Sequence, residues 1–568
     1  MRQPMRKLLG VAAAAVTILA SVGSSPASAA DAPYDVLVFS KTAGFRHDAI
    51  AVGIQAIRDL GSANSFTVTA TEDSSQFNAT TLAQYEAVVF LNTTGDVLNS
   101  TQQTAFENYI RAGGGYVGVH SASDTEYDWS FYGELVGAYF SSHPAIQQAT
   151  IRVENRAHAA TAGLSPTLSR TDEWYNFRTN PRSSARVLAT LDESSYSGGS
   201  MGSDHPHTWC KTYQGGRSFY TGSGHTQSSY SETGFRAVLL GGIRYAANRT
   251  KADCRPETGY TTLYNGSTTG WSQAGPGSFS NSNGTLTGSG GMGMLWYSAK
   301  EFSSYSLKLD WTMPGDDNSG VLVGFPASSD PNSAMTNGYE VQIDATDSAD
   351  RTTGAVYAVK SADITARDAA LNPPGEWNTY ELLVEGERLR VYLNGVQIND
   401  FTNTDSARSL ASGYIGIQNH GNGEDVSFRN IRIKELGGTT PTPRVGRIVS
   451  ATGKCADVSG NSSADGTKIQ LWTCHNNANQ QWTVNGSTLR SLGKCMGVAG
   501  GSTANGGLVQ LATCNGSGGQ NWAAGANGSL VNSQSGRCLD ANGGSTADGT
   551  QLIIWSCHGG TNQRWTLP

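Results

Sequence analysis

A histidine follows a predicted strand in the stretch GGYVGVHSASDTEYDW, which runs from Gly114 to Trp129. The small residues around His120 are typical of the sharp turn at which many α/β enzymes hold a nucleophile. Imidazole is a poor substitute for a thiolate at such a turn, but it titrates near neutral pH and binds divalent metals. The turn therefore predicts a polar site that uses imidazole chemistry and not a thiolate nucleophile.

Further acidic and histidine side chains stand at predicted turns and strand ends of the same region. They are His47, Asp124, Glu126, Glu173, His205, His207 and His225. His205 and His207 flank a proline, a spacing that can place both rings on one side of an extended segment. Three interpretations stay open: a substrate pocket with acid/base groups, a metal site, and histidines that only hold loops together. No cofactor is certain from the sequence, and a divalent metal is the one candidate.

A second set of polar residues follows the alternation of predicted strands. In GYEVQIDA (338–345) three residues share one face: Glu340, Gln342 and Asp344. Gln418 and His420 likewise share a face of GYIGIQNH (413–420). On an antiparallel sheet, such residues are by default a solvated exterior. Two acids and a histidine would alternatively form an acid/base set for glycoside cleavage.

The elements that must position the first set alternate between strand and helix. Strands are predicted at 34–40, 87–92 and 114–120, and helices at 50–61 and 100–112. This order predicts a parallel sheet with helices on both faces, in a domain that spans residues 33–250. Ligands of such folds bind at the carboxyl ends of the strands, where His47 and His120 stand.

The second set belongs to a region of short predicted strands, residues 258–436. The strands are expected at 306–313, 320–325, 338–345, 379–398, 413–420 and 426–436. Many short strands with Gly and Asn turns predict an all-β sandwich of two sheets. A Thr/Pro-rich linker, residues 437–445, follows it.

The C-terminal region, residues 446–568, repeats itself. The tryptophan ends of QQW, QNW and QRW are offset by 40 and 43 residues, and so are the first cysteines of three pairs. The pairs, each 19 residues apart, are Cys455/Cys474, Cys495/Cys514 and Cys538/Cys557. The shared period predicts a threefold repeat with three local disulfides. Cys210 and Cys254 remain, as a fourth disulfide or as buried free thiols.

The first thirty residues predict export. Arg2, Arg6 and Lys7 precede an apolar run and a small-residue end, so residues 1–30 are interpreted as a signal peptide of a secreted, extracellular protein. The formal net charge is −7, and no basic run occurs. Nucleic acid and membrane are therefore not expected partners.

The cysteine pairs and the Q-x-W ends resemble the ricin B-type lectin, a β-trefoil carbohydrate-binding module. The resemblance implies a shallow sugar site in the first and third repeats. The matching positions are Asp457, Trp472, His475, Asn479 and Gln480, and Asp540, Trp555, His558, Asn562 and Gln563. In the middle repeat Gly497, Ala512 and Gly519 replace the Asp, the aromatic and the Asn, so no site is expected there. The alternative is a trefoil that is only a stabilising cap.

The segments DNSGVLVGF, GYEVQID, GYIGIQNHG and VSFRNIRIKEL resemble the 3-keto-disaccharide hydrolase domain, a concanavalin-like jelly roll. The resemblance covers nearly all of 260–436 and implies a sugar-degrading role on oxidised glycosides. The positions carried over as catalytic are Glu340, Gln342, Asp344 and His420, together with Arg429.

The stretch around His120, with TDEWYNF, DHPHTW and GGRSFYTGSGHT, resembles the ThuA-like (trehalose-utilisation) domain, related in fold to class I glutamine amidotransferases. The amidotransferases carry a cysteine where His120 stands, so no glutaminase activity is expected. His120, Glu173 and His225 would then line a pocket that handles a sugar or keto-sugar.

These observations predict a secreted carbohydrate-active enzyme, a hydrolase of glycosidic bonds in (3-keto-)glycosides, whose partner is a polysaccharide or oligosaccharide. The lectin would hold the other domains near that glycan. Two rivals stay open. One is a glycan-adhesion protein without catalysis, and the other confines the chemistry to the first domain.

Overall fold

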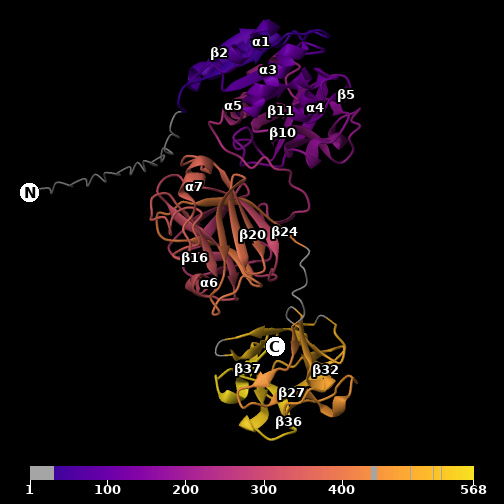
Figure 1. Ribbon diagram of the computed structural model, residues 1–568, viewed down its shortest axis with the longest axis vertical. Coiled ribbons are helices and arrows are strands. Elements are labelled where there is room, and N and C mark those ends of the chain that lie inside the picture. Colours follow the sequence, from indigo (N-terminus) through magenta and orange to yellow (C-terminus); the bar gives the residue numbers. More distant parts are fainter. Residues whose placement is uncertain (1–30, 437–443, 486–487, 516, 526–527, 568) are drawn as a thin grey trace, which may run out of the picture. The chain divides into compact units, whose positions relative to one another are not determined.

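The computed structural model describes residues 31–436, 444–485, 488–515, 517–525 and 528–567 (Figure 1). The predicted signal peptide and residues 437–443 of the predicted linker lie outside this range. By its internal contacts the chain divides into two units, Met1–Leu436 and Gly437–Pro568. No helix in the described part of the chain is long and apolar enough to cross a membrane.

The N-terminal domain is built on a nine-stranded sheet. In spatial order its strands are β2 (Phe66–Thr71), β1 (Tyr34–Phe39), β3 (Ala87–Leu91), β4 (Gly115–Val119), β11 (Gly216–Thr221), β10 (His205–Tyr213), β9 (Arg186–Asp192), β6 (Gln147–Val153) and β7 (Thr167–Asp172). The pairs from β2 to β11 are parallel, as predicted, and the last four strands join in antiparallel. Two short strands, β5 (Phe140–Ser142) and β8 (Asn176–Phe177), pair separately.

Helices cover both faces of this sheet because its central strands are apolar on both sides. The helices are α1 (Ile50–Ala63), α2 (Ala79–Leu82), α3 (Ser100–Arg111), α4 (Ser130–Val136) and α5 (Thr233–Ala246). Val36 and Val38 of β1 belong to the core that includes Ile57 of α1 and Leu239 of α5. Leu37 belongs to the opposite core, with the residues of α3 and α4.

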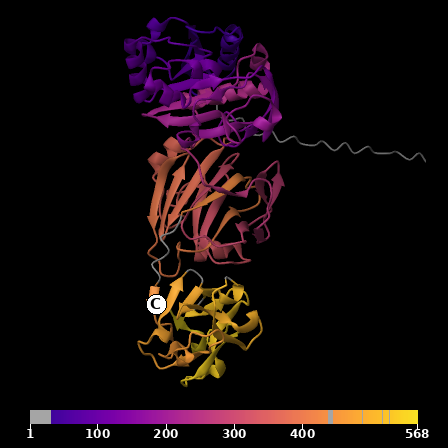
Figure 2. The ribbon, with the colours of Figure 1, turned by 90° about the vertical axis from the view of Figure 1, so that its right-hand side faces the viewer.

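The next domain consists of two stacked antiparallel sheets (Figure 2). One contains β12 (Thr261–Tyr264), β14 (Ser278–Ser282), β15 (Thr285–Ser289), β24 (Ser427–Glu435), β17 (Tyr305–Thr312), β20 (Asn378–Glu385), β21 (Arg388–Leu393) and β22 (Val396–Thr402). The other contains β13 (Trp271–Ala274), β16 (Gly293–Tyr297), β23 (Tyr414–Asn419), β18 (Asn318–Phe325) and β19 (Tyr339–Asp344). The predicted sandwich is confirmed.

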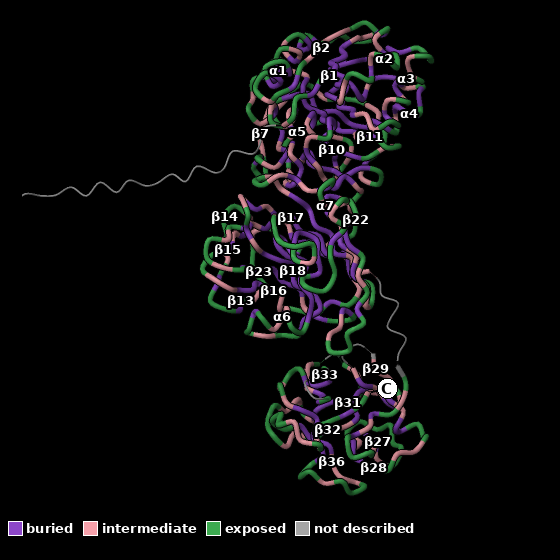
Figure 3. Tube along the Cα trace, turned by 60° about the vertical axis from the view of Figure 1, so that its left-hand side comes forward, coloured by how far each residue is buried: buried purple, intermediate pink, exposed green. Residues whose placement is uncertain are grey.

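Alternation along the strands divides this domain into a core and an outer layer. Val321, Val341 and Ile417 pack between the sheets in one large apolar core, which Figure 3 shows as buried lengths of β17, β18 and β23. The other face of the five-stranded sheet carries a smaller apolar cluster under helix α6 (Pro331–Asn337). A further helix, α7 (Ile364–Ala370), lies between β19 and β20 in the chain.

The C-terminal unit is a β-trefoil of short strands. They are β25 (Arg444–Gly446), β26 (Val449–Ser450), β27 (Cys455–Val458), β28 (Ile469–Trp472), β29 (Trp482–Asn485), β30 (Thr488–Ser491), β31 (Lys494–Val498), β32 (Gly507–Ala512), β33 (Trp522–Ala524), β34 (Leu530–Asn532), β35 (Arg537–Ala541), β36 (Thr550–Trp555) and β37 (Trp565–Thr566). Trp482, Trp522 and Trp565 are buried, and their indole N–H groups donate to equivalent backbone carbonyls at 2.8, 3.0 and 2.9 Å. The internal repeat is therefore a threefold core.

All eight cysteines form disulfides. Cys210 of β10 pairs with Cys254, so the alternative of buried free thiols is wrong. This bond fixes the segment after α5 to the sheet of the N-terminal domain.

The three trefoil disulfides have the predicted pairing, but the two cysteines of each pair differ in their surroundings. The bonds are Cys455–Cys474, Cys495–Cys514 and Cys538–Cys557. The first cysteine of each pair is buried in strand β27, β31 or β35. The second is not buried and lies outside the strands, just after β28, β32 or β36: Cys474 and Cys514 are half-buried, and Cys557 is exposed. Each bond therefore ties a core strand to a surface loop, a difference that the equal spacing of the pairs does not show.

Candidate functional sites

Four predicted side chains of the N-terminal domain meet at the carboxyl edge of its parallel strands. His120 begins a 3-10 helix (His120–Asp124) directly after β4, with a left-handed φ of 51°. Glu173 follows β7, His225 lies in the loop after β11, and His47 precedes α1. One ligand atom from each of these four residues lies within 4.8 Å of all the others. The carboxyl edge of the parallel strands, where the sequence predicts a ligand site, therefore carries a compact His/Glu cluster.

Glu173 is the centre of this cluster. Its Oε2 lies 3.0 Å from His225 Nδ1 and 3.4 Å from His120 Nε2, and the two ring nitrogens are 3.2 Å apart. Burial works to raise the pKa of Glu173, but its bonds to His120 and His225 outweigh it and lower the pKa well below the usual value. Glu173 is consequently a carboxylate at every physiological pH.

Two histidines around this carboxylate have pKa values shifted in opposite directions. Burial, reinforced by His120 and His225, lowers the pKa of His47 to about 3, so its ring is neutral. Burial also works to lower the pKa of His225, but the bond to Glu173 raises it overall. A neutral ring beside an ion pair can hold a metal or exchange protons with a bound polar molecule.

Four other predicted residues do not join the cluster. Both oxygens of Glu126 are occupied, because the backbone N–H groups of Val97 and Leu98 and the Gln103 amide donate to them. Glu126 thus ties two loops together. Asp124 accepts a 2.6 Å bond from Tyr127 beside the cluster.

His205 and His207, which the H-x-H spacing could place on one side of a strand, contact different groups. A register shift interrupts β10 between Pro206 and Thr208, and the two rings have different partners. His205 contacts Glu193 at 2.8 Å and the Tyr175 carbonyl at 2.8 Å. His207 contacts Ser223 at 2.8 Å and lines a separate cavity of about 220 Å³.

Sequence reasoning missed three residues that complete the site. His143 Nδ1 lies 3.0 Å from the second oxygen of Glu173, and the Tyr175 ring packs on His120 with the centroids 4.1 Å apart. Asp172 is fully buried and accepts bonds from the backbone N–H groups of Gly224 and His225. Asp172 and Tyr175 stand one residue before and two residues after Glu173 in TDEWYNF, and this position is the signal that could have found them.

In the sandwich, Glu340, Gln342 and Asp344 share the outer face of β19, as the alternation predicts. In register they lie opposite Leu322, Gly320 and Asn318 of β18. Asn318 joins two of them, because its amide donates to Asp344 at 3.0 Å and its oxygen accepts from Gln342 at 3.3 Å. These side chains form a polar row beside the apolar cluster under α6.

Glu340 is the unusual member of this row. Its residue is 4% exposed, and burial raises the pKa of its carboxyl to about 8, although a bond from Gln418 opposes the shift. Glu340 Oε1, Gln342 Oε1 and Gln418 Oε1 are buried and have no hydrogen-bond partner within the described ranges. Buried polar atoms normally have partners, so this face is suited to a ligand that carries hydroxyl donors.

His420 and Arg429, the other two positions carried over as catalytic in the sandwich, have surroundings different from those of Glu340. The His420 side chain is 46% exposed beyond the end of β23, and its contact is with Glu424 at 3.8 Å. Arg429 belongs to β24 of the other sheet, where its guanidinium stacks on Trp377. Arg429 is therefore not part of this row, because β24 and β19 belong to different sheets.

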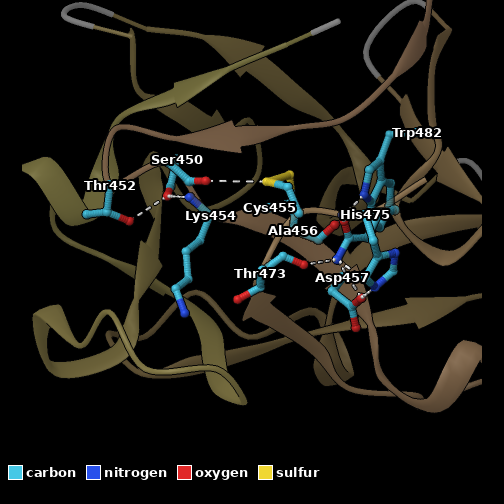
Figure 4. The surroundings of a disulfide bond; sticks show 12 residues. Ser450, Thr452, Lys454, Cys455, Ala456, Asp457, Thr473, His475 and Trp482 are labelled. Atoms are coloured by element: carbon cyan, nitrogen blue, oxygen red, sulfur yellow. Dashed lines mark hydrogen bonds and ion pairs between the residues drawn. A yellow bond between two sulfur atoms is a disulfide. The ribbon is translucent and has the colours of Figure 1, made fainter. Parts of the chain in front are cut away.

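The two predicted sugar sites of the trefoil have the same geometry. Asp457 Oδ2 accepts from Asn479 and Gln480 at 2.8 and 2.9 Å, with His475 at 3.4 Å, and Figure 4 shows Asp457 and His475 beside the Cys455 disulfide. Asp540 has equivalent contacts, to Asn562 and Gln563 at 2.8 Å and to His558 at 3.5 Å.

The glutamines of these sites position other groups. Gln480 also donates to the Thr473 carbonyl and accepts from the His475 N–H, so its amide is fully used. In the middle repeat Gln520 keeps the corresponding bonds to Thr513 and Asn515, where Gly497 replaces the aspartate. The glutamine therefore belongs to the fold of every repeat, and the aspartate and the aromatic ring distinguish the two candidate sites.

We expect replacement of Trp472 and Trp555 by alanine to abolish glycan binding without unfolding the trefoil. Their rings are 38% and 41% exposed, and the equivalent position of the middle repeat is already Ala512. Loss of an aromatic anchor costs about 2 kcal/mol or more per site, so affinity for an immobilised glycan should fall at least about 30-fold. Retention on the affinity column measures this, and unchanged retention would contradict the assignment.

Three family profiles match the chain in sequence. ThuA (trehalose utilisation) matches residues 35–246, the 3-keto-alpha-glucoside-1,2-lyase-like domain matches 259–434, and the ricin-type beta-trefoil lectin domain matches 444–565. The three matches follow one another along the chain without overlap. The three resemblances seen in the sequence are thereby confirmed, and a ricin-type lectin match beside a 3-keto-alpha-glucoside-1,2-lyase-like match supports a carbohydrate-active protein.

Individual relatives each resemble one part of the chain. Beta-galactoside-specific lectin 2 of Viscum album is 40% identical over 67 residues, which are 11% of this chain and 12% of that lectin. A thua-like protein of Bacteroides uniformis is 22% identical, covering 39% of this chain and 95% of its own, with a TM-score of 0.35. A candidate glycosyl hydrolase of Parabacteroides distasonis is 24% identical, covering 31% and 94%, with a TM-score of 0.28.

Proposed function

We propose that this protein is a secreted enzyme that cleaves the glycosidic bond of 3-keto-glycosides in its sandwich domain. The observation that carries the proposal is the Glu340 carboxyl, buried on the sheet face with a pKa of about 8. A carboxyl with this pKa is protonated at neutral pH and can donate its proton to a leaving oxygen.

The partners that the reaction needs are present in the same domain. Gln342 and Gln418 offer buried oxygens to sugar hydroxyl groups, and Asp344 at the end of β19 is a carboxyl beside them. The carbonyl of a 3-keto-sugar makes the proton on the neighbouring carbon acidic. In an elimination, Asp344 or His420 would take that proton from C2, a C1=C2 double bond would form as the bond from C1 to the leaving oxygen breaks, Glu340 would protonate that oxygen, and water would then add to the double bond. In a direct hydrolysis, the same base would instead activate a water that attacks C1 while Glu340 protonates the departing oxygen.

Helix α6 closes one side of this candidate site. Gln418 donates to Met335 Sδ at 3.3 Å, and Ala334 packs on the apolar cluster beside the polar row. Because Glu340 is only 4% exposed, a sugar can contact its carboxyl only when side chains of this cover move aside. Closure over the reacting bond would also exclude bulk water.

The trefoil supports a role on a glycan. Each of its two candidate sites combines a partly exposed tryptophan with a buried aspartate on the paired strand, a set that suits the apolar face and the hydroxyl groups of a sugar. The name of the Viscum album relative points to β-galactosides as the class to test first. The four disulfides and the N-terminal sequence support an extracellular site of action.

The test is a product assay of the purified protein by mass spectrometry. Disaccharides and their 3-keto derivatives are supplied in parallel, and we expect a released sugar from the keto substrates only. Release from neither panel, with retained binding to galactan, would favour the glycan-adhesion protein. Loss of activity in His120→Ala with Glu340→Gln still active would instead place the chemistry in the N-terminal domain.

Gly320 gives a second test, because its lack of a side chain makes room for the Glu340 carboxyl. A Cβ at this position would overlap Glu340 Oε1 and lie 2.6 Å from its Cγ. We expect Gly320→Ala to displace the carboxyl, to lower the cleavage rate at least about 10-fold, and to cost about 1–3 kcal/mol of stability. Gly315→Ala is the control for a glycine substitution in the same domain, because its backbone is not left-handed and the added Cβ would only touch Asp317 Oδ2 at 3.7 Å. Full activity of Gly320→Ala would contradict the placement of the acid.

A further inference from the structure

We propose that His47, His120, Glu173 and His225 bind a divalent transition metal ion, with zinc the best match. Three of the four donors are imidazole nitrogens and the fourth is a carboxylate oxygen. Such a set suits zinc and its neighbours in the periodic table, whereas magnesium and calcium prefer oxygen donors. The site lies in the N-terminal domain and is independent of the cleavage proposed for the sandwich.

The spacing of the donor atoms supports a metal. His120 Nε2, His225 Nδ1 and Glu173 Oε2 form a triangle with sides of 3.0, 3.2 and 3.4 Å. Donors around a tetrahedral ion with bonds of about 2.0–2.1 Å lie about 3.3–3.4 Å from one another. The triangle therefore has almost the size of one face of a zinc coordination shell before any ion is placed in it.

The partners of the outer atoms orient the same donors. His120 Nδ1 lies 2.9 Å from the Gly222 carbonyl, so it carries the hydrogen and leaves the lone pair of Nε2 directed at the cluster. His47 Nδ1 lies 3.3 Å from Ser121 Oγ, which leaves its other nitrogen free. Ligand histidines in metal sites are fixed in this way by hydrogen bonds of the second ring nitrogen.

Glu173 and His225, the other two proposed ligands, also lie in segments held by further contacts. Glu173 Oε1 contacts His143, which leaves Oε2 for the ion. Asp172 accepts from the backbone N–H groups of Gly224 and His225 at 2.9 and 3.1 Å and so fixes the loop that carries His225. These contacts thus orient the rings of His120 and His47 and the Glu173 carboxylate, and they fix the backbone that carries His225.

The backbone of His120 is a further sign of a built site. Its φ of 51° is unfavourable for a residue with a side chain, and its carbonyl accepts a 2.8 Å bond from the Tyr220 hydroxyl that holds this conformation. Strain of this kind persists where the surroundings enforce it, and it is concentrated at functional sites. The strained turn is what brings the His120 ring to the other three ligands.

A hydrogen-bond network is the alternative, and it meets a difficulty. A neutral His120 with its hydrogen on Nδ1 cannot donate from Nε2 to Glu173 Oε2, 3.4 Å away, so this bond requires a second proton on the His120 ring. One cation contacts all these lone pairs without an added proton. The other His/Cys group at metal distance, His158 with Cys210 and Cys254, has its two sulfurs in a disulfide.

The first experiment measures zinc on the purified full-length protein. The protein is stripped with a chelator, titrated with zinc chloride by calorimetry, and analysed for bound metal by mass spectrometry. We expect one tight equivalent per chain and, with cobalt(II) in place of zinc, visible absorption typical of a four-coordinate ion. Absence of saturable binding in the unmodified protein would overturn the proposal, whatever the variants do.

Variants then locate the bound ion. His120→Asn and Glu173→Gln should each weaken zinc binding by more than about 100-fold, while His143→Gln, which changes only an outer contact, should weaken it about 10- to 100-fold. Zinc held instead by His475 or His558 of the trefoil would persist in all three variants and would overturn the assignment. Circular dichroism and glycan binding by the trefoil check that each variant is folded.

Discussion

Replacement of Glu340 by glutamine is expected to lower the rate of glycosidic bond cleavage about 10²- to 10⁴-fold, the contribution of a positioned general acid. Glutamine has nearly the same shape and keeps the contact to Gln418, but it has no proton to give to a leaving oxygen. Initial rates on a 3-keto-disaccharide measure the effect. Glu385→Gln, on an exposed ion pair with Arg390 in the other sheet, is the matched control and should keep full activity.

The pH profile of the unmodified enzyme gives this prediction a second measurement. The acid is active in its protonated form, so kcat/KM should fall as the pH rises through about 8, the pKa that burial gives Glu340. The residual activity of Glu340→Gln should lack this alkaline limb. A profile that is identical in the two proteins would exclude Glu340 as the acid.

The second large effect is on stability. In the folded protein the pKa of Glu340 is about 8, against a usual value of 4.5. Because the folded pKa is raised, the stabilisation is complete below pH 4.5 and is lost as the pH rises toward 8. The whole shift corresponds to about 5 kcal/mol, of which about 4 kcal/mol is lost between pH 5 and pH 9, so Glu340→Gln should gain about 4 kcal/mol relative to the unmodified sandwich over this range.

Urea unfolding at both pH values measures this difference. The comparison of variant and parent at each pH removes the contribution of all other titrating groups, and Glu385→Gln should follow the parent. The unfolding step that must shift is that of the sandwich, since separate domains unfold in separate transitions. An equal stability difference at pH 5 and pH 9 would show that the carboxyl is not held neutral by burial.

The two results together separate catalysis from structure. A stability effect without an activity effect would make Glu340 a buried acid of the fold and would favour the adhesion protein. An activity effect without a stability effect would mean that the Glu340 carboxyl is more exposed in the free protein and that its pKa is raised only when a sugar is bound.

Fold and repeat could be predicted because they follow from local patterns. Strand alternation assigns Glu340 and Val341 to opposite faces of β19 whatever surrounds them. The trefoil cysteines lie on adjacent paired strands or directly after them, so their equal spacing already indicated the pairing. The antiparallel extension of the first sheet was not anticipated, because the pattern of a single strand does not reveal its direction relative to its neighbours.

The sites depended on contacts between distant segments. Sequence reasoning named the four members of the His/Glu cluster but added Glu126 and His205, which have the same chemistry and the same loop positions. Only the tertiary structure shows that Glu126 is occupied by the N–H groups of Val97 and Leu98, and that His205 is bound to Glu193.

By itself, the sequence determined three domains, their order, the disulfides of the trefoil and the polar face of β19, because each rests on a period or a spacing along the chain. The tertiary structure decided which histidines converge on Glu173 and that Arg429 lies on the other sheet. It also decided that Glu340 is buried deeply enough for its pKa to reach about 8. The physical reason is that convergence and desolvation are set by neighbours from remote segments, which no pattern along the chain records.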